Sequence, residues 1–345
     1  MKNTDKSFAV PVSAFDEELV YYDIKNAPIA LYGVFFENGA FRRIPEELAH
    51  RVNKECIALH SNTAGGRAKF RTDSTLISLK VRVRNPKHYP HCTLAMTSGF
   101  DLYVGQPEEY RATFLPPADV KDEYTATVRF DIREEREITI NFPHYCDVLS
   151  LEIGLEQDAI LKPGAGYLPK KPIVYYGSSI TQGACASRPG NTYENRIIRE
   201  LPIDYVNLGF SGSARGEDSM AQYIAGLDMS VFVCDYDYNA PTVEHLRQTH
   251  EKLFRTVRAK HPHLPVVMLT RPKFRLTAEE EEKRAIVRQT YENALTNGDK
   301  NVYYIDGPTL MQYAENDCSV DGAHPNDLGF YSMARVLLEQ LKKIV

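Results

Sequence analysis

IVYYGSSITQG, at residues 173–183, carries the strongest fold signal in the chain. It begins with a short apolar stretch typical of a buried parallel strand and continues directly into Gly177, Ser178 and Ser179. Small polar residues directly after a buried strand are typical of the carboxyl edge of a parallel sheet, where open α/β folds bind ligands. The stretch therefore predicts an α/β domain with a polar site at its sheet edge.

The residues that follow extend this pattern. Further short apolar stretches recur at intervals long enough for a helix between them, and three segments have amphipathic helical spacing. Strands that alternate with helices predict a parallel sheet with helices on both faces. The expected strands are 173–176, 205–208, 231–234, 266–269 and 302–305, and the expected helices are 244–260, 278–296 and 327–343.

The first 160 residues have a different pattern. Apolar and polar residues alternate with a period of two at 77–84, 126–132, 138–142 and 149–155, which indicates antiparallel strands with one buried face. Several such strands in series, separated by Pro, Asn and Gly turns, predict a β-sandwich or jelly roll. Two glycines and three prolines at 162–172 are typical of a linker. We therefore expect a β-sandwich domain at 1–162, a linker at 163–172 and an α/β domain at 173–345.

The composition excludes several classes of protein. The 46 acidic and 41 basic residues give a net charge of −5, which argues against a nucleic acid or an anionic membrane as partner. The six cysteines are scattered, without zinc-type spacing, so we expect free and mostly buried thiols. No apolar run has the length of a signal-peptide core or a membrane span. These features predict a soluble, cytoplasmic protein.

Four polar clusters lie where expected strands end or where the last helix begins. Ser179 follows the first strand of the α/β domain, Gly212 the second and Asn239 the third, while Asp321 and His324 precede the last helix. Because the carboxyl ends of parallel strands meet at one edge, we expect these residues to lie close together. A serine, an imidazole and a carboxylate in proximity are the components of nucleophilic acyl transfer.

These clusters resemble the four blocks that define the SGNH, or GDSL-type, hydrolases. Ser179 matches the family's nucleophile position, Gly212 and Asn239 match its oxyanion glycine and asparagine, and Asp321 and His324 match its D-x-x-H block. The resemblance implies a flavodoxin-like three-layer fold and a serine esterase that needs no metal or cofactor.

The first half carries a second resemblance. Gly99-Phe100-Asp101-Leu102-Tyr103 is similar to the motif of the GxDLY domain, which precedes the hydrolase domain in one bacterial branch of this family. The resemblance therefore reaches both halves, over roughly residues 20–345. Two positions depart from the common pattern: Ser178 replaces the usual Asp, and Tyr238 stands where many members have Gly.

The matched residues imply a specific mechanism. His324 would take the proton of Ser179 and return it to the leaving alcohol, while Asp321 would hold the other ring nitrogen. The backbone N–H groups of Ser179 and Gly212 and the side-chain amide of Asn239 would form the oxyanion hole. An acyl-enzyme on Ser179 would then be hydrolysed by water.

The resemblance also suggests the substrate class. Because related two-domain members often act on glycans, we expect the substrate to be a short acyl ester, an acetate first of all, of a carbohydrate or similar small alcohol. An acyltransferase with the same triad and a small-molecule acceptor is one alternative. A carbohydrate-binding protein with a vestigial hydrolase domain is another. The sequence leaves open whether the chain forms a homo-oligomer.

Structural alternatives exist for several residues. Ser179, Asn239 and Asp321 could each cap a helix, His324 could be a satisfied structural histidine, and Gly209 is expected to be a turn glycine. The loop histidines His88 and His91 are expected to be solvated. Arg188 and Tyr193 lie near the nucleophile in sequence and could either contact substrate or pack inside the protein.

Overall fold

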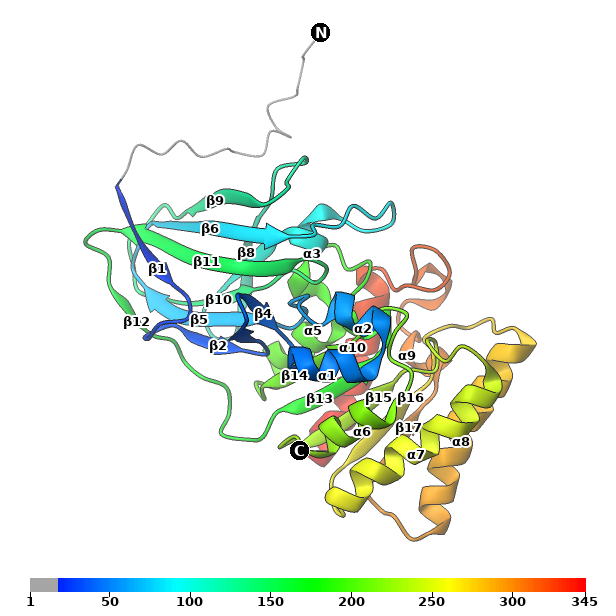
Figure 1. The fold of residues 1–345 in the computed structure, drawn as a ribbon. Coiled ribbons are helices and arrows are strands. Elements are labelled where there is room, and N and C mark those ends of the chain that lie inside the picture. Colours follow the sequence, from blue (N-terminus) through cyan, green and yellow to red (C-terminus); the bar gives the residue numbers. More distant parts are fainter. Residues whose placement is uncertain (1–17) are drawn as a thin grey trace.

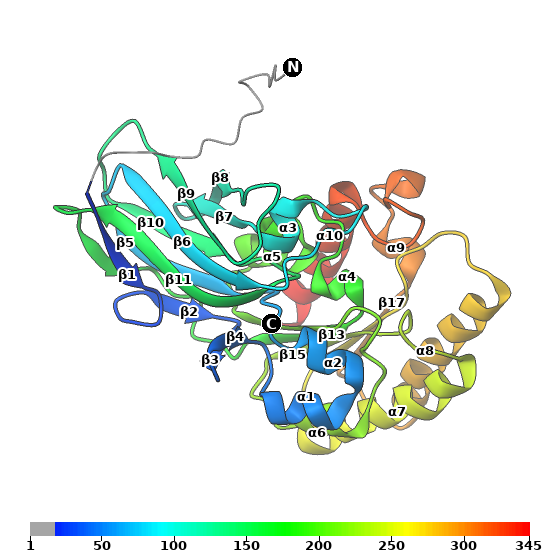
Figure 2. The same cartoon turned by 45° about the horizontal axis from the view of Figure 1, so that its top comes forward.

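The computed structural model describes residues 18–345. Figures 1 and 2 show the strands of the first half stacked above a third sheet that helices cover on both sides. The expected order, an antiparallel sandwich followed by a parallel α/β unit, is therefore confirmed. The signal-peptide prediction concerns residues outside the described part of the chain. No helix within 18–345 combines the length and apolar character needed to cross a bilayer.

The sandwich forms because alternate apolar side chains of both sheets share one core. In β6, Leu79 and Val81 are buried while Lys80 and Arg82 are exposed, as the period of two predicts. One sheet has the order β1-β11-β6-β9 and the other β12-β5-β10-β7-β8, with β2 beside β5. The bounds are β1 Leu19–Asp23, β2 Ala30–Tyr32, β5 Arg67–Thr72, β6 Leu76–Arg84, β7 Phe100–Val104, β8 Glu109–Phe114, β9 Glu123–Arg129, β10 Arg136–Asn141, β11 Asp147–Glu156 and β12 Leu161–Pro163.

Two features of the first half differ from the sequence-based expectation. The strand expected at 126–132 ends at Arg129, and Ile132 lies beyond it with 66% of its surface exposed. The chain also forms a hairpin and three short helices that no long apolar period predicts. These are β3 Phe35–Glu37, β4 Ala40–Arg42, α1 Glu46–Val52, α2 Lys54–Leu59 and α3 Leu94–Ser98.

The parallel sheet has the strand order β14-β13-β15-β16-β17, which is the 2-1-3-4-5 order of flavodoxin-like folds. Alternate residues of β13 enter different cores: Val174 and Tyr176 face α6, α7 and α8, whereas Ile173 and Tyr175 face α4, α5 and α10. Every expected strand and helix of this half is present, with ends within one residue. The bounds are β13 Ile173–Gly177, α4 Ser179–Gln182, α5 Tyr193–Glu200, β14 Tyr205–Gly209, α6 Asp218–Ala225, β15 Val231–Asp235, α7 Val243–Lys260, β16 Val266–Leu269, α8 Ala278–Thr296, β17 Val302–Ile305, α9 Gly307–Leu310 and α10 Asp327–Ile344.

The GFDLY motif joins the two halves of the molecule. Asp101 of β7 is fully buried, pairs with Arg188 at 3.0 Å and accepts the backbone N–H of Gly190 at 2.7 Å. It also accepts a hydrogen bond from Asn141 of β10 at 2.7 Å. Burial raises the pKa of Asp101, and the Arg188 charge together with these hydrogen bonds opposes the rise. One buried carboxylate of the sandwich thus anchors the loop that leads into α5.

Asp101→Ala should lower the free energy of unfolding by about 3 kcal/mol, because Arg188 would stay largely buried without its partner. Urea unfolding followed by circular dichroism measures the change. The matched control is Asp228→Ala, whose carboxylate pairs with Lys171 on the open surface and should contribute less than about 1 kcal/mol. Equal losses in the two variants would contradict the anchoring role.

Candidate active site

Three side chains form a hydrogen-bonded row at the carboxyl edge of the parallel sheet. Ser179 is the first residue of α4, and its Oγ lies 2.9 Å from Nε2 of His324, 145 positions later in the chain. Nδ1 of His324 lies 2.8 Å from Oδ2 of Asp321. Both ring nitrogens are therefore engaged, which fixes the imidazole in an orientation that can accept the Ser179 proton.

The sequence around each residue explains this placement. The strand β13 ends at Gly177, where an added Cβ would lie 2.1 Å from Oγ1 of Thr181, so α4 can begin only against a glycine. None of the three residues that could cap a helix, Ser179, Asn239 and Asp321, does so. The caps of α4, α7 and α10 are instead Ser178, Thr242 and Asn326.

Asp321 is held as a carboxylate. Its burial raises the pKa, but hydrogen bonds from the backbone N–H and the ring of His324 and from the backbone N–H of Ala323 outweigh burial and lower the pKa to about 2. The pair can therefore stabilise the imidazolium that forms when a serine gives up its proton.

Two of the three expected oxyanion donors, Gly212 and Asn239, lie on adjacent loops of the same edge. Gly212 has a φ of 67° and an added Cβ there would meet nothing within 4 Å, so its backbone borders open space. Nδ2 of Asn239 donates to the carbonyl of Phe210 at 2.8 Å, which ties the two loops together. Because an amide nitrogen carries two hydrogens, the second remains available to a ligand.

The Gly212 loop is held rigidly by residues from other elements. Oε1 of Gln182, in α4, accepts the backbone N–H of Ser211 at 2.9 Å. The buried guanidinium of Arg43, from the first half, donates to the carbonyl of Gly209 and lies over the ring of Phe210 at 4.5 Å. Rigid donors cost little reorganisation when a negative charge develops on a substrate oxygen.

Gly209 corrects one sequence-based expectation. It is the last residue of β14 and not a turn glycine. An added Cβ would lie 2.2 Å from the backbone nitrogen of Gln182. The glycine therefore lets β14 and α4 pack closely, which brings the Gly212 loop next to Ser179.

His91 is the residue that the sequence did not assign to this site. Its side chain is exposed, as expected, yet its ring stacks on the ring of His324 with centroids 5.5 Å apart and an interplanar angle of 29°. It lies in the loop between β6 and α3, drawn in cyan, which in Figures 1 and 2 projects from the sandwich towards the orange loop ahead of α10. Sequence spacing could place His91 in a loop, but it could not show which part of the second half that loop touches.

The two residues with open roles near the nucleophile both pack inside the protein. Arg188 pairs with Asp101, as described above. Tyr193 is fully buried, and its hydroxyl lies 3.1 Å from Oγ1 of Thr181 in α4. Both residues therefore stabilise the segments next to Ser179 and do not line the site.

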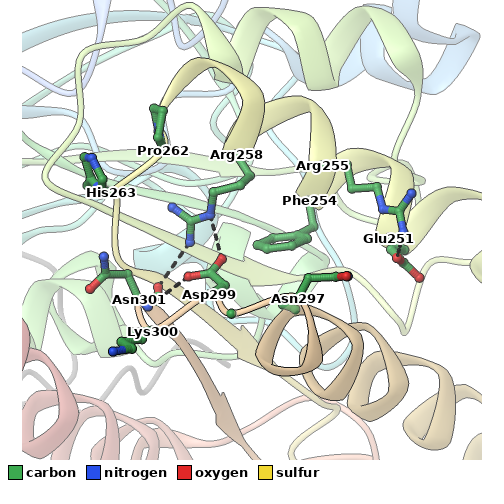
Figure 3. Close-up of a pocket in the computed structure, with 12 residues that line it drawn as sticks. Glu251, Phe254, Arg255, Arg258, Pro262, His263, Asn297, Asp299, Lys300 and Asn301 are labelled. Carbon is green, nitrogen blue, oxygen red and sulfur yellow. Dashed lines mark hydrogen bonds and ion pairs between the residues drawn. The ribbon is translucent and has the colours of Figure 1, made fainter.

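A separate pocket, shown in Figure 3, lies at the opposite edge of the sheet. It is lined by residues that precede β16 and β17, such as His263 and Asn301, so it borders the amino ends of these strands. Arg258 points into it but is engaged by Asp299 at 2.8 Å and by the carbonyl of Asn301 at 3.2 Å. These contacts explain the position of Arg258 without a ligand. None of Ser179, Asp321 and His324 lines this pocket.

Comparison with known proteins identifies the family. Residues 170–342 match the model of the GDSL-like lipase/acylhydrolase family. The chain belongs to this family. Residues 19–161 match the GxDLY model, described as the N-terminus of SGNH-hydrolase-type esterases. The protein is therefore an SGNH-type hydrolase with a GxDLY domain in front, as the two sequence motifs predict.

Solved structures of several such hydrolases and related enzymes share the whole fold. A GDSL-like lipase from Bacteroides ovatus is 28% identical, with a TM-score of 0.85 over 95% of this chain and 98% of its own. The salicylyl-acyltransferase SsfX3 from a tetracycline biosynthetic pathway is 20% identical, with a TM-score of 0.76 over 94% and 97%. An acetyl xylan esterase from the rumen bacterium Butyrivibrio proteoclasticus is 11% identical, with a TM-score of 0.63 over 94% and 98%. No curated protein matches the sequence.

Asp321→Asn should lower kcat/KM for an ester substrate by about 10⁴-fold. The pKa of about 2 means that the Asp321 charge is complete above pH 4 and is lost only as the pH falls through 2. The loss in the variant should therefore be present at every pH from 5 to 8. A pH–rate profile of both proteins measures this, with Asp317→Asn, an exposed acid in the same loop, as the control. A deficit confined to acid pH would refute this role for Asp321.

Proposed function

We propose that this SGNH hydrolase removes short acyl groups, acetyl in the first instance, from carbohydrates or similar small alcohols through an acyl-enzyme on Ser179. The observation that carries the proposal is the 2.9 Å contact between Oγ of Ser179 and Nε2 of His324, in line with the Asp321 carboxylate. A serine hydroxyl becomes a useful nucleophile only when a base within this distance takes its proton.

The proposed reaction proceeds in two steps. Oγ of Ser179 attacks the ester carbonyl while His324 takes its proton. The resulting oxyanion accepts hydrogen bonds from the N–H groups of Ser179, Gly212 and Asn239. His324 then gives the proton to the leaving alcohol, and the acyl-enzyme forms. In the second step, water loses a proton to His324, attacks the acyl carbon and releases the free acid, and the proton returns to Ser179.

Two observations support a carbohydrate as the alcohol part. The loop that carries His91 also carries Tyr89, whose ring is partly exposed and packs edge-on against Tyr145 at 5.7 Å. Flat aromatic faces beside the triad can pack against the C–H face of a sugar ring. The second is the fold shared with an acetyl xylan esterase, which is an argument from analogy.

An acyltransferase with the same triad is the second candidate. It is favoured by the shared fold with the salicylyl-acyltransferase and by the first-half loop that packs His91 over His324. If this loop shields an acyl-enzyme from water, an alcohol acceptor can compete for the acyl group.

Ser179→Ala should abolish turnover of 4-nitrophenyl acetate, with a loss of about 10⁴-fold or more in kcat. The matched control is Ser219→Ala in α6, a serine outside the site, which should keep wild-type turnover. An inactive wild-type protein, or an active Ser179→Ala variant, would refute the proposal.

Product analysis distinguishes hydrolysis from transfer. The wild-type protein is assayed with acetylated sugars and with esters of increasing acyl-chain length. We expect the acetates to be hydrolysed fastest. With sugar or small-alcohol acceptors added at rising concentration, an esterase yields mainly free acid. Acyl transfer that dominates at low acceptor concentration would assign the protein to the acyltransferases instead.

A further inference from the structure

Two thiols and an imidazole from separate parts of the chain meet beside the catalytic row. Sγ of Cys92 lies 3.9 Å from Sγ of Cys185. The ligand atoms of Cys92, Cys185 and His91 all lie within 4.8 Å of one another. Cys92 and His91 come from the loop between β6 and α3, and Cys185 follows α4, so the cluster spans both domains.

The distance between the two sulfurs suits a metal ion. A disulfide requires sulfurs about 2.0 Å apart, and both thiols here are free. Two thiolates on one tetrahedral Zn²⁺, each about 2.3 Å from the ion, lie about 3.8 Å apart. The observed separation of 3.9 Å is therefore close to that of a zinc-bound pair.

The backbone holds the cluster in place. Cys185 has a φ of 70°, a left-handed conformation that is costly for any residue with a side chain and is seen mainly where the surroundings impose it. Oγ1 of Thr93, next to Cys92, donates to the carbonyl of Ser187 at 2.6 Å, and the backbone N–H of Ser187 donates to Asp327 at 2.8 Å. The two thiols are thus presented to each other by two loops that are tied together.

We propose that His91, Cys92 and Cys185 bind a soft divalent cation, Zn²⁺, through three protein ligands. Thiolate and imidazole are the ligands that select zinc over magnesium or calcium, and the fourth position stays open to water. The ion would tie the loop of the GxDLY domain to the hydrolase domain and fix the ring that stacks on His324. This inference does not rest on the esterase reaction, because metal binding is measured without turnover.

The test is titration of the reduced, chelator-treated full-length protein with Co²⁺, which replaces Zn²⁺ in such sites and gives a thiolate charge-transfer band. We expect one equivalent of Co²⁺ to bind with this band, Zn²⁺ to displace it, and Zn²⁺ to raise the Tm by several degrees. His91→Asn should keep the band but weaken Co²⁺ binding by at least tenfold.

Cysteine variants locate the ion. Cys92→Ser and Cys185→Ser should lose most of the band and the Zn²⁺-dependent rise in Tm, whereas Cys318→Ser, which removes a thiol outside the cluster, should keep both. Cys185→Gly is a second variant at this position, because glycine accepts the left-handed backbone; it should fold and should also lose most of the band.

Three results would overturn the proposal. The first is the absence of stoichiometric binding by the reduced protein, including the case in which the pair only forms a disulfide under oxidation. The second is Co²⁺ bound without a thiolate band and unaffected by the cysteine variants, which would place the ion on His91, Asp321 and His324, whose ligand atoms also lie within 4.8 Å of one another. The third is loss of binding in Cys318→Ser to the same degree as in Cys92→Ser.

Discussion

The register of three parallel strands is the constraint on which the site depends. Gly177 at the end of β13 pairs with Gly209 of β14 and with Asp235 of β15, so the three strands end level with one another. The segments that follow them leave the sheet at one edge and carry Ser179, Gly212 and Asn239, the three expected oxyanion donors. A slip by one residue would exchange the side chains that face the two helical layers, and both cores would be lost. The pairing that buries the apolar residues therefore also aligns the polar ones.

The first half of the chain supports the loops that carry the site. Asp101 of the sandwich anchors the loop ahead of α5, and Arg43, which follows the β3–β4 hairpin, supports the turn that carries Gly212. The helices α1 and α2 go further, since Leu48 and Cys56 pack in the same core as the helices α6 and α7 of the second half. These contacts give a physical reason why the two family models occur together in one chain.

The sequence predicted the parts of the fold that depend on local periodicity. The alternation in β6 and the apolar stretch of β13 each specify a strand without reference to the rest of the chain. Ser179 could be placed at the sheet edge because it follows a strand closely, and the family resemblance added Asp321 and His324 and the roles of all three. Short helices such as α1 were missed because their few apolar residues pack against a distant partner.

Contacts between distant loops could not be predicted. His91 and Cys185 are ordinary residues in the sequence, and their chemistry appears only when the β6–α3 loop lies against the segment after α4. Gly209 shows the same limit: its sequence context favours a turn, but the close approach of β14 to α4 is what requires a residue without a side chain.

The loop between β6 and α3 has a consequence for how this architecture diversifies. It runs from β6 of the sandwich to α3, and His91 near its second end stacks on the imidazole of His324. Surface loops accept insertions and exchanges at little cost to folding stability. A change in this loop can therefore alter the surroundings of the His324 ring while the strands and loops that carry Ser179 and Asp321 stay in place.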